Sequence, residues 1–89
     1  MTKIYPLDIP KDSGSVTVST VTAGGSKAVT ITTSISGLPI AVKLSTSTSD
    51  AYVVFVGVED NKIYARAYNT GGADQDVVVD WEARILQGA

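Results

Sequence analysis

The sequence contains neither cysteine nor histidine. Without cysteine there is no disulfide framework and no thiolate metal site, and without histidine the commonest general base and the commonest metal ligand are both missing. Serines and threonines are plentiful, but no motif supplies any of them with an activating base. The composition therefore predicts a non-enzymatic protein with no catalytic residue, no cofactor and no metal site.

Charge of either sign is sparse, and long apolar runs are missing. Seven Lys and Arg stand against nine Asp and Glu, without any basic cluster. A nucleic-acid partner is not expected, because phosphate binding needs clustered Lys and Arg. The opening residues, MTKIYPLDIP, lack the apolar run and cleavage site of a signal peptide, and no segment approaches the length needed to cross a bilayer. We therefore expect no membrane partner and no signal peptide.

Valine, serine and threonine dominate the 89 residues, and glycine pairs recur between runs of them. This composition is typical of short antiparallel strands joined by tight turns, and the length is that of one small domain. The expected organisation is an N-terminal arm over residues 1–13 and an all-β, six-stranded antiparallel β-sandwich over residues 14–89. The expected strands are residues 14–22, 27–36, 39–47, 51–59, 62–69 and 76–86.

The turn residues predict how these strands connect. Gly24 and Gly25 can adopt positive φ at little cost and predict a hairpin between the first two strands. Asp60-Asn61 joins AYVVFVGVE to KIYARAY and predicts a second tight hairpin, because both residues tolerate left-handed backbone. Connections this short favour a meander or Greek key in two packed sheets.

Alternation along the strands predicts the core. In GADQDVVVDWEARI, the valines at 77 and 79 and Trp81 share one face, while Asp80 and Glu82 share the other with Arg84. We interpret the acidic pair as part of a solvated face rather than a catalytic carboxylate pair. A similar alternation places residues 40, 42 and 44 on one face. The predicted core comprises Trp81, Val77, Val79, Ile40, Val42 and Leu44.

The stretch AYVVFVGVE is apolar on both of its faces, with Val53 and Phe55 opposite the other valines. A parallel sheet would cover both faces, but these connections are too short for parallel crossovers, so a second copy of the chain is the favoured cover. The alternative cover is the N-terminal arm, through its apolar residues Ile4, Tyr5, Leu7 and Ile9. An aromatic-and-arginine face on the next strand is typical of a contact surface. The predicted subunit or ligand contacts are Val53, Phe55, Tyr64, Arg66 and Tyr68.

The stretch PIAVKLSTSTSDAYVVFVGVEDNKIYARAYNTGGADQDVVVDWEARI resembles the small six-stranded β-sandwich of H-type lectins and similar modules of bacteriophage tail fibres and other virion proteins. In that pattern a proline opens a valine strand, a hairpin leads into a strand reading Y-x-x-x-A-x-N, and a valine-rich strand ends in W-x-A. The matching residues here are Pro39, Tyr64, Tyr68, Asn69, Trp81 and Ala83.

The resemblance implies a homotrimer about a three-fold axis, which agrees with a strand that needs cover on both faces. It implies a virion structural protein, a capsid decoration, head fibre or tail-fibre and baseplate module, assembled in the bacterial host cytoplasm with other virion proteins. The alternative is a lectin-like domain that binds a host cell-surface glycan. Sugar-binding members carry aromatic and histidine side chains just before the last strand, where this chain has Asn69, Thr70 and Gln75, so no sugar-binding residue is carried over.

Overall fold

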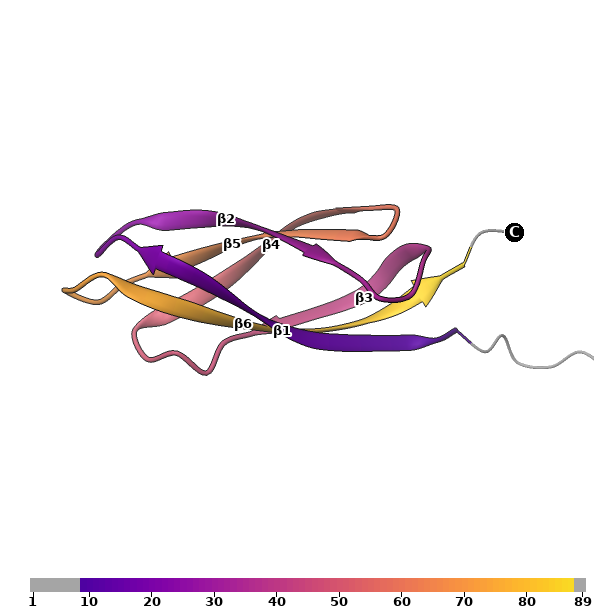
Figure 1. Cartoon of the computed structure of the whole chain (residues 1–89), viewed down its shortest axis with the longest axis horizontal. Helices are drawn as coiled ribbons and strands as arrows, with labels where there is room; N and C mark the ends of the chain where they lie inside the picture. Colours follow the sequence, from indigo (N-terminus) through magenta and orange to yellow (C-terminus); the bar gives the residue numbers. More distant parts are fainter. Residues whose placement is uncertain (1–8, 88–89) are drawn as a thin grey trace, which may run out of the picture.

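The computed structural model describes residues 9–87, which form six strands and no helix. All strands pair antiparallel in two three-stranded sheets, ordered β1-β6-β3 and β2-β5-β4 (Figure 1). Within the described residues, nothing helical offers the length and apolarity needed to cross a membrane. The strands are β1 Lys11–Val21, β2 Ser26–Thr32, β3 Leu38–Ser45, β4 Ala51–Glu59, β5 Lys62–Asn69 and β6 Gln75–Leu86.

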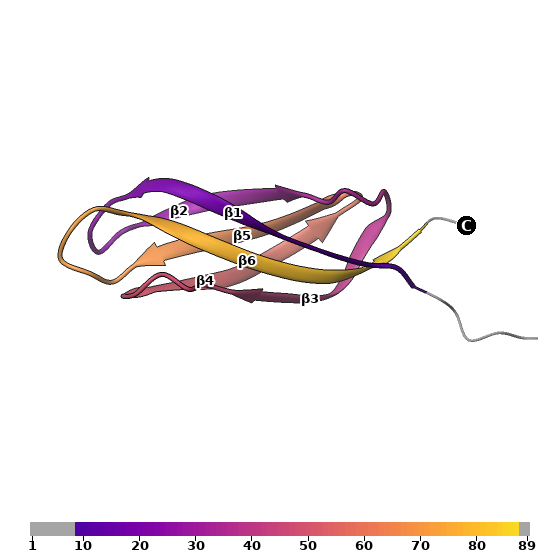
Figure 2. The ribbon, with the colours of Figure 1, turned by 60° about the horizontal axis from the view of Figure 1, so that its bottom comes forward.

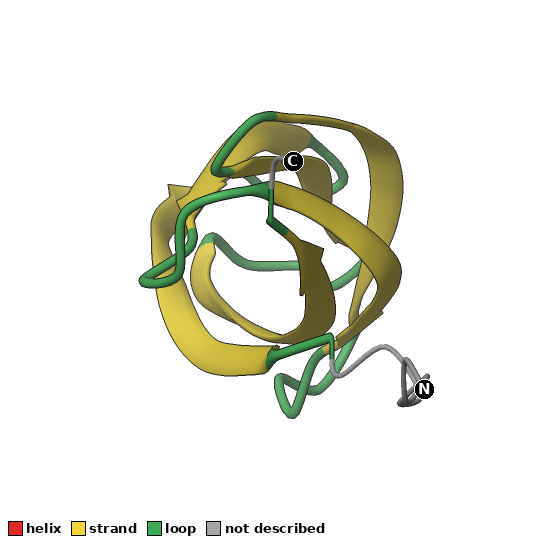
Figure 3. Ribbon diagram, turned by 90° about the vertical axis from the view of Figure 1, so that its right-hand side faces the viewer, coloured by secondary structure: helices red, strands yellow, loops and turns green. Residues whose placement is uncertain are grey.

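The two sheets pack face to face, so that each strand of one sheet lies against a strand of the other (Figures 2 and 3). Both sheets contribute their inward side chains to one hydrophobic cluster. The sequence prediction of an all-β chain with two packed antiparallel sheets is confirmed at this level. The core comprises Val18, Val21, Val29, Ile31, Ile63, Ala65, Ala67, Val77, Val79, Trp81, Ala83 and Ile85.

The predicted hairpin between the first two strands is wrong, because β1 and β2 belong to different sheets. The turn itself is tight, with Gly24 at φ 72° and the Gly25 N–H donating to the Thr22 carbonyl at 2.8 Å. β1 loses its regular register with β6 after Val18, and Thr20 adopts φ 50°. After this bulge β1 pairs with β6 once more, through Val21 and Gln75, and the turn at the glycines then starts β2 in the opposite layer.

The carboxylates of Asp74 and Asp76 hold this bend. They accept hydrogen bonds from the main-chain N–H of Ala23 and of Thr20, at 2.9 and 2.8 Å. These acidic residues at the start of β6 thus satisfy donors that the end of the β1–β6 ladder leaves without a strand partner.

The predicted hairpin at Asp60-Asn61 is present and is the one place where consecutive strands within residues 9–87 pair in the same sheet. Asn61 takes φ 67°, a left-handed conformation that asparagine tolerates better than most residues. Glu59 and Lys62 face each other directly across the turn. This hairpin places the aromatic strand β5 in the middle of its sheet.

Trp81 lies inward on the middle strand β6, opposite Gly14 of β1 and Leu44 of β3. A Cβ atom added to Gly14 would lie 2.9 Å from the indole Nε1, closer than such atoms approach in folded proteins. Glycine at this position therefore makes room for the ring. Val77 and Val79 are fully buried beside it, as the alternation predicts.

The predicted grouping of Ile40 with Val42 and Leu44 is wrong. Leu44 pairs with Trp81 and faces inward, whereas Ile40 pairs with Arg84, whose side chain points outward. The register shifts between residues 40 and 43, where Ala41 adopts φ 50°. A bulge of this kind inserts an extra residue and reverses the side that the following residues face. Val42 and Leu44 are half-buried against the core, and Pro39 takes the inward place expected for Ile40.

β1 begins at Lys11, three residues earlier than the sequence prediction, and β2 ends at Thr32 rather than at residue 36. The segment after β2 is held by Asp12, which is 8% exposed. Its carboxylate accepts hydrogen bonds from the N–H groups of Ser13, Ser34 and Ile35 and from the Ser34 hydroxyl. Residues 1–8, which include the predicted arm contacts Ile4, Tyr5 and Leu7, lie outside the described residues.

Candidate functional site

The candidate site is the outward side of the β2-β5-β4 sheet, which we call the aromatic face. Register places β5 residues 64, 66 and 68 on this side, because residues 63, 65 and 67 are buried inward. Their cross-strand neighbours on β2 and β4 therefore point outward as well. The aromatic face comprises Ala28, Thr30, Tyr52, Val54, Val56, Tyr64, Arg66 and Tyr68.

Two tyrosines of this face stack on each other. Tyr52 of β4 lies directly opposite Tyr68 of β5, with ring centroids 4.7 Å apart and planes only 7° from parallel. Tyr52 is 47% exposed, so the pair presents a flat apolar surface with polar tips to the solvent. Val54 and Val56 extend that surface along the strand and are 42% and 64% exposed.

Tyr64 occupies the other end of the same strand face. Its hydroxyl donates a 2.6 Å hydrogen bond to Glu59 Oε1, and this bond, with some burial and the nearby charge, raises the pKa of Tyr64. The bond fixes the ring next to the β4–β5 turn. Beside it a depression of about 310 Å³ lies over β5, between β2 and β4. The depression is lined by Ala28, Val29, Thr30, Val56, Tyr64, Ala65 and Arg66.

Arg66 lies at the centre of the aromatic face, between Ala28 on β2 and Val54 on β4. It is half-buried and makes no ion pair within residues 9–87, where the one salt bridge joins Lys11 to Glu82 on the other sheet. A guanidinium amid tyrosine and valine has five donors to offer a partner surface. The face thus combines aromatic, aliphatic and arginine side chains, a composition enriched at protein contacts.

The structure brings together only three of the five predicted contact residues. Tyr64, Arg66 and Tyr68 share the aromatic face, but Val53 and Phe55 lie opposite Ala67 and Ala65 and point to the inward side. A regular two-residue hairpin would have placed Phe55 opposite Arg66. The bulge between Phe55 and Gly57 shifts the register by one residue, so Val53 and Phe55 lie on the other side of the sheet from Tyr64, Arg66 and Tyr68.

Position on the inward side does not bury Phe55. Val53 packs against the core, whereas Phe55 remains 50% exposed because β4 is an edge strand. The β4 residues that accompany the aromatic strand are Tyr52, Val54 and Val56, which the sequence analysis did not select. The alternation of AYVVFVGVE indicates that these three residues share a side. Which side of the sheet that is could not be predicted, because it depends on the bulge.

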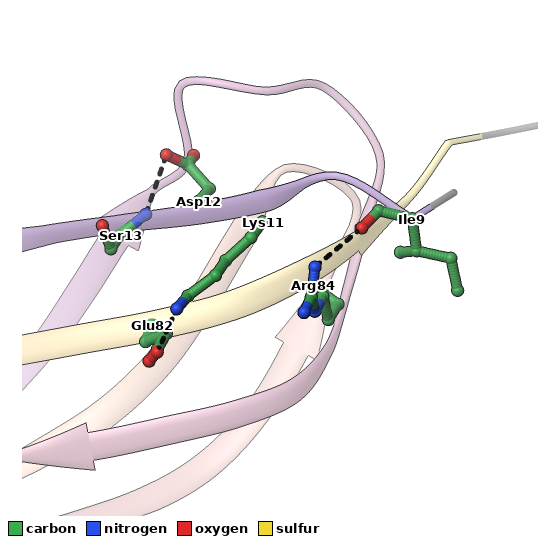
Figure 4. Close-up of polar contacts among 6 residues, drawn as sticks. All are labelled: Ile9, Lys11, Asp12, Ser13, Glu82 and Arg84. Atoms are coloured by element: carbon green, nitrogen blue, oxygen red, sulfur yellow. Dashed lines mark hydrogen bonds and ion pairs between the residues drawn. The ribbon is translucent and has the colours of Figure 1, made fainter. Parts of the chain in front are cut away.

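The outward side of the β1-β6-β3 sheet, which we call the charged face, is built differently. Lys11 Nζ lies 2.8 Å from Glu82 Oε1, and the Ser15 hydroxyl donates to Asp80 Oδ1 at 2.8 Å. The hydrogen bond and positive charge of Lys11 lower the pKa of Glu82. Figure 4 shows this pair beside Arg84, whose guanidinium donates to the Ile9 carbonyl. Glu82, Asp80 and Arg84 on this face thus have partners within the chain.

Asn69, one of the three residues at the position where the lectin pattern has sugar-contacting side chains, is 1% exposed. Its amide nitrogen donates to the carbonyls of Val21 and Ala73, and its amide oxygen accepts from the Gly71 N–H and from Gln75 Nε2. These bonds use its polar atoms to tie the β5–β6 turn to the end of β1. Within residues 9–87, no group of three or more acidic, His or Cys side chains could hold a metal ion.

Comparison of the chain with protein-family models, with curated proteins and with solved structures gives no match. The candidate site is therefore defined by its own geometry.

Proposed function

We propose that this protein is a non-enzymatic structural component of a bacteriophage or prophage particle that works by assembling with copies of itself. In this proposal the two sheets form an H-type lectin-like β-sandwich, and three copies associate through their aromatic faces. The trimer would serve as a capsid decoration, a head fibre or a tail-fibre or baseplate module, in contact with other virion proteins. The virion setting rests on the resemblance of residues 39–85 to such modules.

One observation carries the assembly part of the proposal: apolar side chains crowd the outward side of one sheet. Tyr52, Val54 and Val56 are each more than 40% exposed and adjoin one another on β4. Removing apolar surface from water contributes roughly 25 cal/mol per Å². A contiguous apolar patch rimmed by polar residues is characteristic of a protein contact. The outward side of the opposite sheet has a smaller apolar pair at one end, Leu38 and Leu86, and the other outward residues of β6 are mainly charged.

A small chain gains from such association. A domain of this size buries a smaller share of its surface than a larger domain does, so its own core supplies limited stability. Contacts between copies add buried area without lengthening the chain. A second copy of the chain is thus the occupant that we assign to the aromatic face.

Light scattering coupled to size exclusion, at several micromolar protein, tests this proposal with a matched pair of variants. Arg66→Glu reverses a charge at the centre of the aromatic face, on the middle strand β5. Arg84→Glu makes the same change on the charged face, on the middle strand β6. We expect a mass of three chains, or of a multiple of three, for the wild type and for Arg84→Glu, and loss of the three-fold assembly for Arg66→Glu. Equal masses for the two variants would overturn the assignment of the aromatic face.

Glycan recognition is the second candidate function, favoured by the depression beside Tyr64 and Arg66. An exposed tyrosine ring can stack on a sugar, and the hydroxyl of Thr30 and the guanidinium of Arg66 can donate hydrogen bonds to sugar oxygens. The ligand would be a glycan of the host cell surface, and the protein would then contribute to host attachment.

A glycan array tests this second function. Binding at millimolar affinity or tighter that is lost on Tyr64→Ala, while the variant keeps the mass of the wild type, would support it. Absence of binding across cell-wall glycans, or binding that Tyr64→Ala and Tyr68→Ala leave unchanged, would reject it.

A further inference from the structure

The four edge strands of the two sheets are not equally protected against pairing with another chain. Edge strands usually carry charges, prolines or bulges that discourage such pairing. β1 begins with Lys11 and Asp12, β2 carries Lys27, and β3 carries Pro39 and Lys43. β4 has a bulge at Val56 but differs from the other edge strands, because its residues 51–58 include neither a charged residue nor a proline.

β4 also exposes apolar side chains on both of its sides. Val56 and Tyr52 lie outward and are 64% and 47% exposed, while Phe55 lies inward and is 50% exposed. A partner that covered only the aromatic face would leave Phe55 in water. A strand added beside β4 would cover side chains on both sides at once.

The main-chain groups of β4 that face the free edge follow from its register. The Thr70 N–H donates to the Asp50 carbonyl at 2.8 Å, so Asp50 directs its main-chain groups toward β5. These groups alternate in direction along an antiparallel strand. Tyr52 and Val54 therefore also face β5, and Ala51, Val53 and Phe55 direct their N–H and C=O groups to the free edge.

We propose that β4 pairs antiparallel with β4 of a second copy, about a two-fold axis at Val54. The two sheets then join into one continuous sheet in the order β2-β5-β4-β4-β5-β2. This contact deepens the proposed function and rests on it, since it supplies a second place at which copies assemble. Combined with a three-fold contact through the aromatic face, it joins two trimers.

The register centred on Val54 satisfies both the side chains and the main chain. It places Val53 opposite Phe55 of the second copy, so that these residues exchange main-chain hydrogen bonds on both sides of the axis. It brings Tyr52 next to Val56, the bulge residue and the most exposed large apolar residue of the strand. A second copy is the occupant because the strand is complementary to itself in this register.

A single-cysteine experiment tests the contact, because the chain has no cysteine of its own. In the proposed register Val54 faces its own copy in a non-hydrogen-bonded pair, with Cα atoms roughly 4.5 Å apart, inside the range that a disulfide bridges. We expect Val54→Cys to oxidise to a covalent dimer at low micromolar concentration. Val53→Cys, which faces Phe55, and Ser45→Cys, on the edge strand β3, are the matched controls and should remain uncross-linked.

The outcomes separate this inference from the proposed function. Cross-linking of Val54→Cys alone supports the pairing. A wild-type oligomer by light scattering without cross-linking at Val54, or with equal cross-linking of the controls, overturns the pairing and leaves the aromatic-face assembly in place. A wild-type monomer that does not cross-link rejects both. Amide hydrogen exchange of the wild type gives a reading free of variants: slow exchange at Ala51, Val53 and Phe55 supports the pairing, and fast exchange overturns it.

Discussion

The outward sides of the two sheets differ in how their side chains are satisfied. On the charged face, Glu82 pairs with Lys11 and Asp80 accepts from Ser15, so its acids have partners within the chain. On the aromatic face, Tyr52 and Val54 remain open to water, and Arg66 has no carboxylate partner within residues 9–87. The acidic side chains of the charged face thus have partners within the chain. The aromatic face instead leaves apolar side chains and Arg66 available for contact with a partner.

The largest expected effect is on association, from a charge placed on the aromatic face of the β2-β5-β4 sheet. Val54→Lys puts an ammonium group at the meeting point of the aromatic face and the β4 edge. We expect the free energy of association to fall by about 2–4 kcal/mol, as for the loss of a central contact residue. Ser45→Lys makes the same addition on an outward position of the edge strand β3 and should leave association unchanged. Sedimentation velocity over a concentration series measures both, and similar dissociation of the two variants would break the comparison.

The next largest effect is expected for Asp12, whose carboxylate joins β1 to the segment that follows β2. Burial alone raises the pKa of this carboxyl, but the hydrogen bonds from Ser34, Ile35 and Ser13 outweigh it and hold the pKa below its ordinary value of 3.8. Because the folded pKa is the lower one, this stabilisation is present above the ordinary pKa and is lost as pH falls through the folded pKa. Asp12→Ala should lower the free energy of unfolding by about 2 kcal/mol at neutral pH.

Urea unfolding at fixed protein concentration, repeated between neutral pH and pH 2, measures this effect. The difference between wild type and Asp12→Ala should shrink as the pH approaches the acid end. A difference that stays constant with pH would show that the ionised carboxylate contributes nothing through these hydrogen bonds.

A smaller effect is expected from the stacked tyrosines of the aromatic face. A double-mutant cycle with Tyr52→Ala and Tyr68→Ala should give a coupling of about 0.5–1.5 kcal/mol in the free energy of unfolding. The cycle is best measured by urea unfolding at a concentration below that of assembly. Additive single changes would mean that the rings act only by area and do not support each other.

The smallest effect is expected on the charged face. Lys11→Ala removes the exposed salt bridge with Glu82 and should leave the unfolding midpoint in urea unchanged, at low and at high salt, because exposed ion pairs add little. A clear, salt-sensitive loss of stability would show that this face depends on its ion pair, and the contrast between the sheets would have to be restated.

The alternation of apolar residues was enough to predict the strands and the β4–β5 hairpin. Val77, Val79 and Trp81 lie inward because a regular strand turns alternate side chains to one side. Asp60-Asn61 marked the hairpin because these residues tolerate the left-handed turn that joins its strands.

The remaining errors of the prediction come from two β-bulges and one turn whose effect the residue types at those positions do not indicate. One extra residue at Val56 moved Phe55 to the inward side, and the bulge at Ala41 turned Ile40 outward. The residues of the Gly24-Gly25 turn did not indicate that its strands belong to different sheets, and the main-chain partners of this segment, Asp74 and Asp76, lie some fifty residues away in the sequence. The register of each strand and the sheet to which it belongs are therefore set by tertiary contacts rather than by the local sequence pattern.

The mass of the wild-type protein in solution, measured by light scattering at several micromolar, tests the central claim most directly. If the β2-β5-β4 sheet is completed by other copies of the chain, the mass will be that of three chains, or of six where the β4 edges also pair. A mass of one chain across the concentration range would contradict the account, because the exposed residues of β4 would then be stable in water without a partner.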